Sequence, residues 1–384
     1  MGWRLADVLA IDAGRYLVAH RVGAAVAAAY RAIPACRTAL LGGHVARCEK
    51  GHVVGVYYNS CRNRCCPSCG WGLGRKWLRR QSRTLLGCGH HHVIFTIPHE
   101  FNALWPRNQR VLGSALFKAA SAAISKLAGD RRYLGAQPGI IIGLHTWGQQ
   151  LGLHLHLHCL VSGGGLDAQG KWVMSRRKWF LPEEPLLRLF RGKLIYAVRG
   201  LVRDGSLRLP AGWTAKDVER LCDRVKGRHW NIDVRERYEQ PTHVLKYLGR
   251  YLNGGPINES RLVSVSEEAV QFTYKDYRDT NPFGVPAKKL REMSREQFVQ
   301  RLMQHVPPKG FHMVRGYGAY RAGGMTGEQR EELRLALPLS FELQAELSPR
   351  SESDAAKARP QICPTCNSAV HLIYYGRGAP ELAA

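Results

Sequence analysis

The chain has 384 residues, enough for one large domain or two to three smaller ones, each with its own core. Its 56 Lys and Arg against 30 Asp and Glu give a formal net charge of +26. This charge favours a polyanionic partner, because each phosphate contact releases condensed counterions. We find no apolar run of the roughly 18 residues that a membrane span needs and no signal-peptide pattern. We therefore expect a cytoplasmic or nucleoid protein with no membrane partner.

The expected elements mix helices and strands along the whole chain. The residues up to about 47 are Ala-rich with helical spacing, 48–69 read as a loop segment with little core, and 74–86 read as a basic amphipathic helix. Further elements follow in this order: a strand at 91–100, a helix at 108–128, a strand pair at 139–148 and 151–163, a strand at 229–238, a helix at 241–255, a hairpin at 263–279, and a helix followed by a strand or turn at 294–318. This order predicts an α+β fold with helices packed on one face of a sheet.

Cysteines cluster early in the chain. Six of the eleven lie between Cys36 and Cys69, and without an export signal they indicate metal binding rather than disulfides. The knuckle Cys66-Pro-Ser-Cys69, with Cys61 five residues before it, supplies three thiolates for tetrahedral zinc. We expect Cys48 to complete the site, with His52 as the next candidate.

A second C-x-x-C, Cys363 and Cys366, follows a segment of linker composition at 344–360. It either forms half of a metal site completed by His371 and another group, or binds no metal. The remaining Cys88, Cys159 and Cys222 are expected to be small core residues.

The segment GLHLHLHCLVSGGG at 152–165 alternates leucine and histidine. In a strand the leucines face the core and His154, His156 and His158 face the other side. Neighbouring histidines on one face are about 6–7 Å apart and the outer pair about 13 Å, so at most two bind one ion. We expect His156 and His158 as ligands, with His154 as a supporting group or alternative ligand. A solvated polar strand face is the simpler alternative.

Two tyrosines, Tyr247 and Tyr251, are four residues apart on the expected helix at 241–255 and therefore share one face, which His243 extends by a turn. Lys246 and Arg250 flank them, and positive charge lowers the pKa of a phenol and makes it a better nucleophile. Tyrosines at the margin of a core are the alternative interpretation.

Several blocks of the chain resemble the rolling-circle insertion-sequence transposases of the IS91 type, which belong to the HUH endonuclease superfamily and carry two tyrosines. They are CRTALLGGHVARCEKGH with NSCRNRCCPSC in the expected zinc segment, HLHLHCLVSGGGL, YLGRY followed by INESRL, and QFVQRLMQHVPPKGFHMVRGYG. The resemblance implies an HUH-type antiparallel sheet with packed helices, a small N-terminal zinc-binding domain and a mixed C-terminal region. The expected segments are a helical and zinc-binding domain at 1–88, a catalytic domain at 89–262, a hairpin and helical extension at 263–343, and a linker with the C-x-x-C tail at 344–384.

The resemblance also implies a chemistry. His156 and His158 would hold a divalent cation, Mg²⁺ by resemblance although imidazole ligands favour Mn²⁺, with His243 or His92 as a third ligand. Tyr247 and Tyr251 would nick and rejoin single-stranded DNA of transposon ends and target through a 5′-phosphotyrosine. The zinc segment would present basic side chains to DNA, and Trp71 and Trp77 could stack on unpaired bases. The candidate DNA contacts are Arg62, Arg64, Arg75, Lys76, Arg79 and Arg80, with Lys246 and Arg250 beside the tyrosines.

Two other functions remain to be compared. The spacing HLHLHCL also resembles histidine-triad nucleotide hydrolases and transferases, in which His156 would be the nucleophile and no metal would be needed. Such enzymes are small and roughly neutral, unlike this chain. A zinc-bearing DNA-binding regulator, in which the histidines and tyrosines are incidental, is the second alternative.

Overall fold

The computed structural model describes residues 2–82, 84–175, 181–235, 238, 255–338 and 362–377. The chain divides into two compact units. The first, here called the cysteine unit, comprises Met1–Arg79, Asn253–Val306 and Glu346–Ala384. The second, here called the histidine unit, comprises Arg80–Leu252 and Pro307–Ala345. Both units are discontinuous along the chain, whereas the four expected segments are contiguous, and 263–306 cluster with the cysteine unit.

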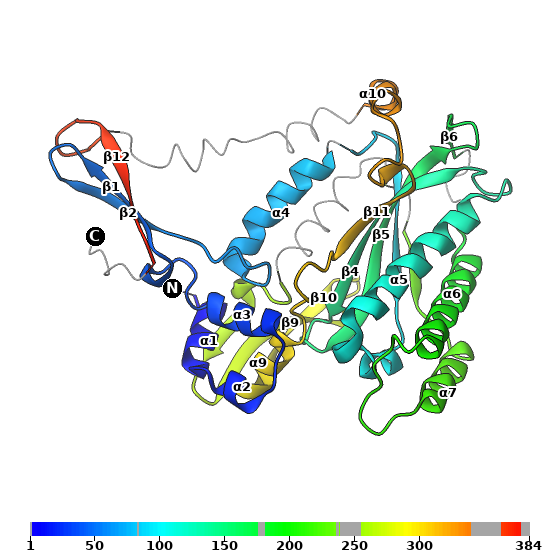
Figure 1. Cartoon of the computed structure of the whole chain (residues 1–384), viewed down its shortest axis with the longest axis horizontal. Helices are drawn as coiled ribbons and strands as arrows, with labels where there is room; N and C mark the ends of the chain where they lie inside the picture. Colours follow the sequence, from blue (N-terminus) through cyan, green and yellow to red (C-terminus); the bar gives the residue numbers. More distant parts are fainter. Residues whose placement is uncertain are drawn as a thin grey trace. The chain divides into compact units, whose positions relative to one another are not determined.

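The histidine unit is built on a six-stranded antiparallel sheet with the order β11-β4-β5-β3-β7, in which β6 also pairs with β5. Its strands are β3 (His90–Thr96), β4 (Gln137–Trp147), β5 (Leu153–Leu166), β6 (Trp172–Met174), β7 (Ile232–Val234) and β11 (Val314–Tyr317). The long strand β5 therefore lies in the middle, with β4 on one side and β3 on the other (Figure 1).

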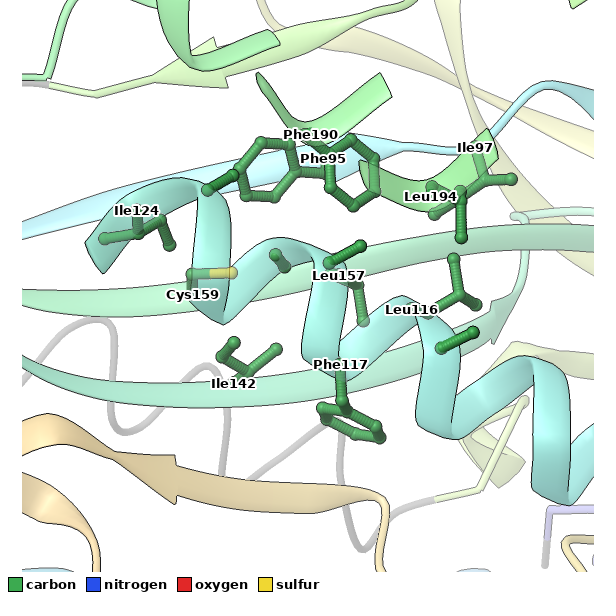
Figure 2. Packing of buried hydrophobic residues seen from close by; sticks show 14 of the residues in the cluster. Phe95, Ile97, Leu116, Phe117, Ile124, Ile142, Leu157, Cys159, Phe190 and Leu194 are labelled. Carbon is green, nitrogen blue, oxygen red and sulfur yellow. The ribbon is translucent and has the colours of Figure 1, made fainter. Parts of the chain in front are cut away.

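Three helices cover one face of this sheet: α5 (Trp105–Ala128), α6 (Glu183–Arg203) and α7 (Ala215–Lys226) (Figure 1). The strands direct alternate apolar side chains toward them, as a strand with one buried face must. Phe95 of β3 and Leu157 and Cys159 of β5 are fully buried against the helices, and the ring of Phe95 lies 4.3 Å from that of Phe190 between centroids (Figure 2). A further helix, α10 (Gly327–Ala336), has no buried residue.

Helix α5 is, among the described residues, the one helix long and apolar enough to cross a membrane. Its most apolar window is 67% buried inside the chain, because its small residues pack on the sheet. This burial identifies α5 as a core helix. The expectation that no stretch is long and apolar enough to span a membrane is thus wrong, because α5 meets the length and mean hydropathy that such a span needs. Its few Arg and Lys do not lower the mean hydropathy of its most apolar window enough to exclude it.

The cysteine unit contains two three-stranded antiparallel sheets, with the orders β12-β1-β2 and β10-β9-β8. Its helices are α1 (Leu5–Asp12), α2 (Arg15–Ala19), α3 (Ala24–Ala32), α9 (Arg295–Met303) and the greater part of α4 (Pro67–Ser82). Its strands are β1 (Gly43–Cys48), β2 (Val53–Tyr58), β8 (Leu262–Val265), β9 (Ala269–Thr280), β10 (Pro286–Ser294) and β12 (Val370–Tyr375).

A buried polar group joins α1, α3 and α9 in the cysteine unit. The Asp12 carboxylate accepts hydrogen bonds from the Tyr30 hydroxyl and, at 3.0 Å, from the Tyr16 amide, and one of its oxygens lies 3.5 Å from Nε of Arg295. Asp12 and Arg295 are almost entirely buried. Burial and the bond to Asp12 raise the pKa of Tyr30 to about 12.

Most of the expected elements are confirmed, but the loop expected at 48–69 instead contains strand β2 and the first residues of α4. The strands at 91–100 and 139–163, the helix at 108–128 and the hairpin at 263–279 are β3, β4 with β5, α5, and β8 with β9. The α+β class with an antiparallel sheet and packed helices is confirmed as well. The expected helix at 241–255 and the linker at 344–360 fall outside the described residues, apart from Gly255.

Candidate functional site

Histidines gather on the sheet face opposite the helices in the histidine unit. Strand register brings them together, because His156 of the central strand lies opposite His145 of β4. The next histidine of the same face, His158, lies opposite Gly143 of β4 and Ile94 of β3. Side chains directly opposite each other across a ladder are about 4.5–5.5 Å apart at Cβ, closer than neighbours along one strand.

Three of these imidazoles converge. One ring nitrogen from each of His145, His156 and His158 lies within 4.8 Å of the other two. The ring centroids are 5.1 Å apart for His145 and His156, 4.5 Å for His145 and His158, and 4.9 Å for His156 and His158. We call these three side chains the histidine group. Its arrangement is that of three ligands around a common point.

Hydrogen bonds orient two members of the group. The Nδ1 of His156 lies 2.8 Å from the carbonyl oxygen of His154, and because a carbonyl only accepts, Nδ1 carries the proton. The Nε2 lone pair of His156 is then left for a metal. The Nδ1 of His158 shares a proton with Nε2 of His92 across 3.0 Å, and the two rings stack at 5.2 Å.

Burial keeps these histidines neutral. It lowers the pKa of His156 to about 4 and holds the pKa of His145 and His158 well below the usual value, with like-charge repulsion among the imidazoles adding to the effect at the latter two. Burial, with the nearby Arg235, also lowers the pKa of His92 to about 4. A metal requires the neutral imidazole, so the group is in the ligating form at neutral pH.

The composition of the group differs in part from the expectation. His156 and His158 lie together as expected, and the third member is His145, which was not among the expected ligands. His154, expected as a supporting group or alternative ligand, is not a member of the group. His154 is exposed and contributes its backbone carbonyl to His156. His92, expected as a possible third ligand, instead contacts His158 through a hydrogen bond. The other candidate, His243, lies outside the described residues, as do Tyr247, Tyr251, Lys246 and Arg250.

His145 is the site residue that the sequence reasoning missed. The residues Ile140, Ile142 and Leu144 are buried in the core, so His145 faces the opposite side of the sheet. The short turn after Trp147 then sets the register that places it beside His156. Counting residues outward from that turn would instead pair His145 with Leu155, because the register shifts by one residue between His145 and Trp147.

The cysteines form two separate groups in the cysteine unit. In the first cysteine group, Cys36, Cys61, Cys66 and Cys69 have sulfur atoms within 4.8 Å of one another. Cys69 Sγ lies 3.5 Å from Cys36 Sγ and 3.6 Å from Cys61 Sγ. Backbone N–H groups of Cys61 and Asn63 point at sulfur, 3.4 Å from Cys36 and Cys61 respectively, which stabilises thiolates.

The second cysteine group consists of Cys48, His52, Cys363 and Cys366, again with ligand atoms within 4.8 Å. The expected placement of Cys48 and His52 beside Cys61, Cys66 and Cys69 is therefore corrected. The reason is the hairpin of β1 and β2, which places Cys48 and His52 at its turn. Cys36, four residues beyond the end of α3, fills the fourth position of the first group.

Comparison with known proteins identifies the chain's relatives. The family model described as "Putative transposase" matches residues 139–327, and the one described as "Transposase zinc-binding domain" matches residues 9–97. The chain is 34% identical over 346 residues to "Putative transposase y4qJ" of Sinorhizobium fredii, covering 88% of this chain and 85% of that protein. It is 32% identical over 331 residues to the "Transposase for insertion sequence element IS801" of Pseudomonas savastanoi, covering 79% and 73%. The chain belongs to the IS91-type transposases.

The matched segments of the transposase overlap the two kinds of site. The transposase match contains His145, His156 and His158, and the zinc-binding match contains all of the first cysteine group. The zinc-binding domain and its cysteines support a structural zinc ion. Cys363 and Cys366 lie beyond both matched segments.

The basic residues expected to contact DNA differ in exposure. Arg62 is exposed and takes a left-handed φ of 51° beside the first cysteine group, and Lys76 and Arg80 on α4 are also exposed. Arg64 is half-buried, and burial lowers its pKa, so it is a weaker candidate for a phosphate contact. Arg79 and Trp77 are half-buried, and the side chains of Trp71 and Arg75 lie outside those described.

Proposed function

We propose that this transposase nicks and rejoins single-stranded DNA at insertion-sequence ends through a 5′-phosphotyrosine, in rolling-circle transposition in the cytoplasm. The carrying observation is the convergence of His145, His156 and His158 on the face of the central strand. Three neutral imidazoles in one place, in a DNA-acting enzyme with a net charge of +26, suit a divalent cation beside a phosphodiester.

The donor set fits a cation that accepts nitrogen ligands. Mg²⁺ prefers oxygen, whereas Mn²⁺ and later metals accept imidazole, so Mn²⁺ suits this group better. When bound, the cation would polarise the scissile phosphate and offset its developing charge. His156, held by the carbonyl of His154, and His158, held by His92, would be its fixed ligands.

Tyr247 and Tyr251 are the proposed nucleophiles. One phenol loses its proton as its oxygen attacks the scissile phosphorus, and an O–P bond to tyrosine forms. The bond from phosphorus to the 3′ oxygen breaks, and the 3′ end takes up a proton and leaves as a hydroxyl. Attack by a 3′-hydroxyl on the phosphotyrosine reverses the step and joins new ends. The phosphodiester energy is retained, and no nucleotide triphosphate is consumed.

Chain connectivity supports the pairing of these tyrosines with the histidines. The backbone of Tyr238 hydrogen-bonds with that of His90 at the start of β3, with both N···O distances at 2.8 Å. His92, two residues further along β3, bonds to His158. The chain from Tyr238 to Tyr247 can extend up to about 30 Å, which is ample to bring a phenol to this face.

The test is adduct formation on single-stranded oligonucleotides that carry candidate element ends, with Mn²⁺ or Mg²⁺, read on denaturing gels. We expect a protein–DNA adduct that is lost in the Tyr247→Phe, Tyr251→Phe double variant and in His156→Ala. Tyr196→Phe and His229→Ala are matched controls, because both side chains are exposed in the same unit and should leave the adduct unchanged. An adduct that survives the tyrosine double variant would refute the assignment, and no adduct from any oligonucleotide would favour the DNA-binding regulator.

A further inference from the structure

The second cysteine group is assembled from two turns that are remote in sequence. In the first turn the amide of Cys48 donates to the carbonyl of His52 at 3.0 Å, and the amide of Gly51 donates to the carbonyl of Cys48 at 2.9 Å. Gly51 has a φ of +87°, a conformation that favours glycine. Cys48 and His52 are thereby turned to the same side of the hairpin.

The second turn has a similar construction. The amide of Cys363 donates to the carbonyl of Ser368, and the amide of Asn367 donates to the carbonyl of Cys363, both at 2.9 Å. The sulfur of Cys366 lies 2.9 Å from the Ser368 hydroxyl, a supporting contact of the kind found around metal ligands. Strand β12 follows this turn and pairs with β1, with Cys48 opposite Val370, so both turns lie at the same end of the sheet (Figure 1).

The interatomic distances fit a tetrahedral zinc ion. With Zn–S near 2.3 Å and Zn–N near 2.0–2.1 Å, two sulfurs of such a site are about 3.8 Å apart and a sulfur and a nitrogen about 3.6 Å. Here Cys48 Sγ lies 3.5 Å from Cys366 Sγ. His52 Nδ1 lies 3.5 Å from Cys48 Sγ and 3.7 Å from Cys363 Sγ. These sulfurs are too far apart for a disulfide, in which they are about 2.05 Å apart.

Apolar burial does little to hold β12 in place. Its residues Leu372, Ile373 and Tyr374 are 45%, 40% and 64% exposed. A strand that buries neither face adds little stability through its ladder alone. By contrast Cys363 and Cys48, at 1% and 4% exposure, are among the most buried residues of this sheet and its turns. The stabilising interaction is therefore concentrated at the four ligands.

We propose that Cys48, His52, Cys363 and Cys366 bind a second structural zinc ion, which fastens the segment 362–377 to the hairpin of β1 and β2. This site is separate from the first cysteine group and takes half of its ligands from outside the matched zinc-binding segment. His371, the expected partner if Cys363 and Cys366 bind a metal, instead lies exposed with its Nε2 3.7 Å from a carboxylate oxygen of Glu49. Among the described residues, Cys48 belongs to no other group of candidate metal ligands.

Metal content of the full-length protein tests the number of sites. With His145→Ala and His156→Ala in the background, so that the histidine group does not also take up zinc, we expect two zinc ions per chain by elemental mass spectrometry, one for each cysteine group. The Cys363→Ser, Cys366→Ser double variant should retain one, and so should Cys48→Ser. Combining all three substitutions should still leave one, because they remove the same ion. Pro364→Ala with Thr365→Ala is the matched control, since both residues are exposed within the same turn and the ligands remain.

Protection of the cysteine thiols from alkylation gives a second test, which uses the unaltered chain and so does not depend on whether a variant folds. During stepwise chelation, alkylation should reach Cys48, Cys363 and Cys366 together, in a phase distinct from that of Cys36, Cys61, Cys66 and Cys69. One zinc ion per chain would overturn the proposal. So would loss of both ions in the triple variant together with protection of Cys48 in the same phase as Cys61, since Cys48 would then belong to the first group.

Discussion

The buried histidines make the histidine unit sensitive to acid in a way that can be calculated. Burial lowers the pKa of His90 to about 3 and, with smaller contributions from neighbouring groups, lowers that of His92 and His156 to about 4. In the unfolded chain each titrates near pH 6.5. Above that pH neither state binds a proton at these sites. As the pH falls below 6.5, the unfolded state takes up protons that the folded state excludes, so unfolding becomes more favourable.

The size of the stability loss at pH 5 depends mainly on the pKa of these histidines in the unfolded chain. Each residue contributes about 1.5 pH units at about 1.36 kcal/mol per unit, or about 2 kcal/mol. The three residues together lower the free energy of unfolding by about 6 kcal/mol, comparable with the whole stability of a typical domain, about 5–15 kcal/mol. We therefore expect the unit to lose most of its stability between pH 6.5 and pH 5 when no divalent cation is added, and the loss to continue below pH 4, because the folded-state pKa of His90 is about 3 and those of His145 and His158 lie well below the usual value.

Hydrogen exchange read by mass spectrometry measures this loss within β3, β5 and α5 separately from the cysteine unit. After correction for intrinsic exchange, the opening free energy should fall by at least about 6 kcal/mol from pH 7 to pH 5, since His145 and His158 add to the effect of the other three histidines. His92→Asn should reduce that fall by about 2 kcal/mol, whereas His229→Asn, at an exposed position, should not change it. A fall below about 2 kcal/mol in the unaltered chain would refute the reasoning, because these imidazoles would then have to be protonated in the folded state.

Three further outcomes are expected. His145→Ala should raise the Mn²⁺ concentration needed for adduct formation at least about tenfold. His154→Ala should leave that concentration nearly unchanged, because His156 contacts only the backbone of residue 154. Equal effects of the two substitutions would contradict the proposed ligand set. Phe95→Ala should destabilise the histidine unit by about 3–5 kcal/mol in denaturant titrations, since the ring is fully buried, and a loss under 1 kcal/mol would show that the core relaxes around it. Asp12→Ala should lower the free energy of unfolding of the cysteine unit by about 3–5 kcal/mol, because Arg295 would remain buried without its ion-pair partner. Adding Arg295→Met should restore much of this stability. If it does not, the loss comes from another interaction of Asp12.

Local sequence patterns were sufficient to predict most helices and strands and the two members of the histidine group that lie on β5. The alternation of leucine and histidine in β5 fixes which residues share a face, whatever strands lie beside it. The pattern therefore identified His156 and His158. It offered His154 as a supporting group or alternative ligand, because a single strand provides only its own neighbours as further ligands.

Pairing between strands decided what the pattern could not. His145 joins the group through the register of β4 with β5, and a register depends on a turn and its bulges rather than on composition. The cysteines show the same limit. Cys66 and Cys69 are close in sequence and were predicted together. The fold of the intervening backbone places Cys36 beside them and Cys48 in the second cysteine group. Ligands that come from different turns require a three-dimensional structure.

The pairing of β12 with β1 joins residues that leave the ribosome far apart in time. Cys48 and Cys366 are separated by 318 positions in the sequence. During most of translation, the edge of β1 that later pairs with β12 therefore has no partner strand. An open edge of this kind readily recruits another chain. A messenger cut short before codon 362 would yield a protein with that edge permanently uncovered, and such products should aggregate more readily than the full-length chain.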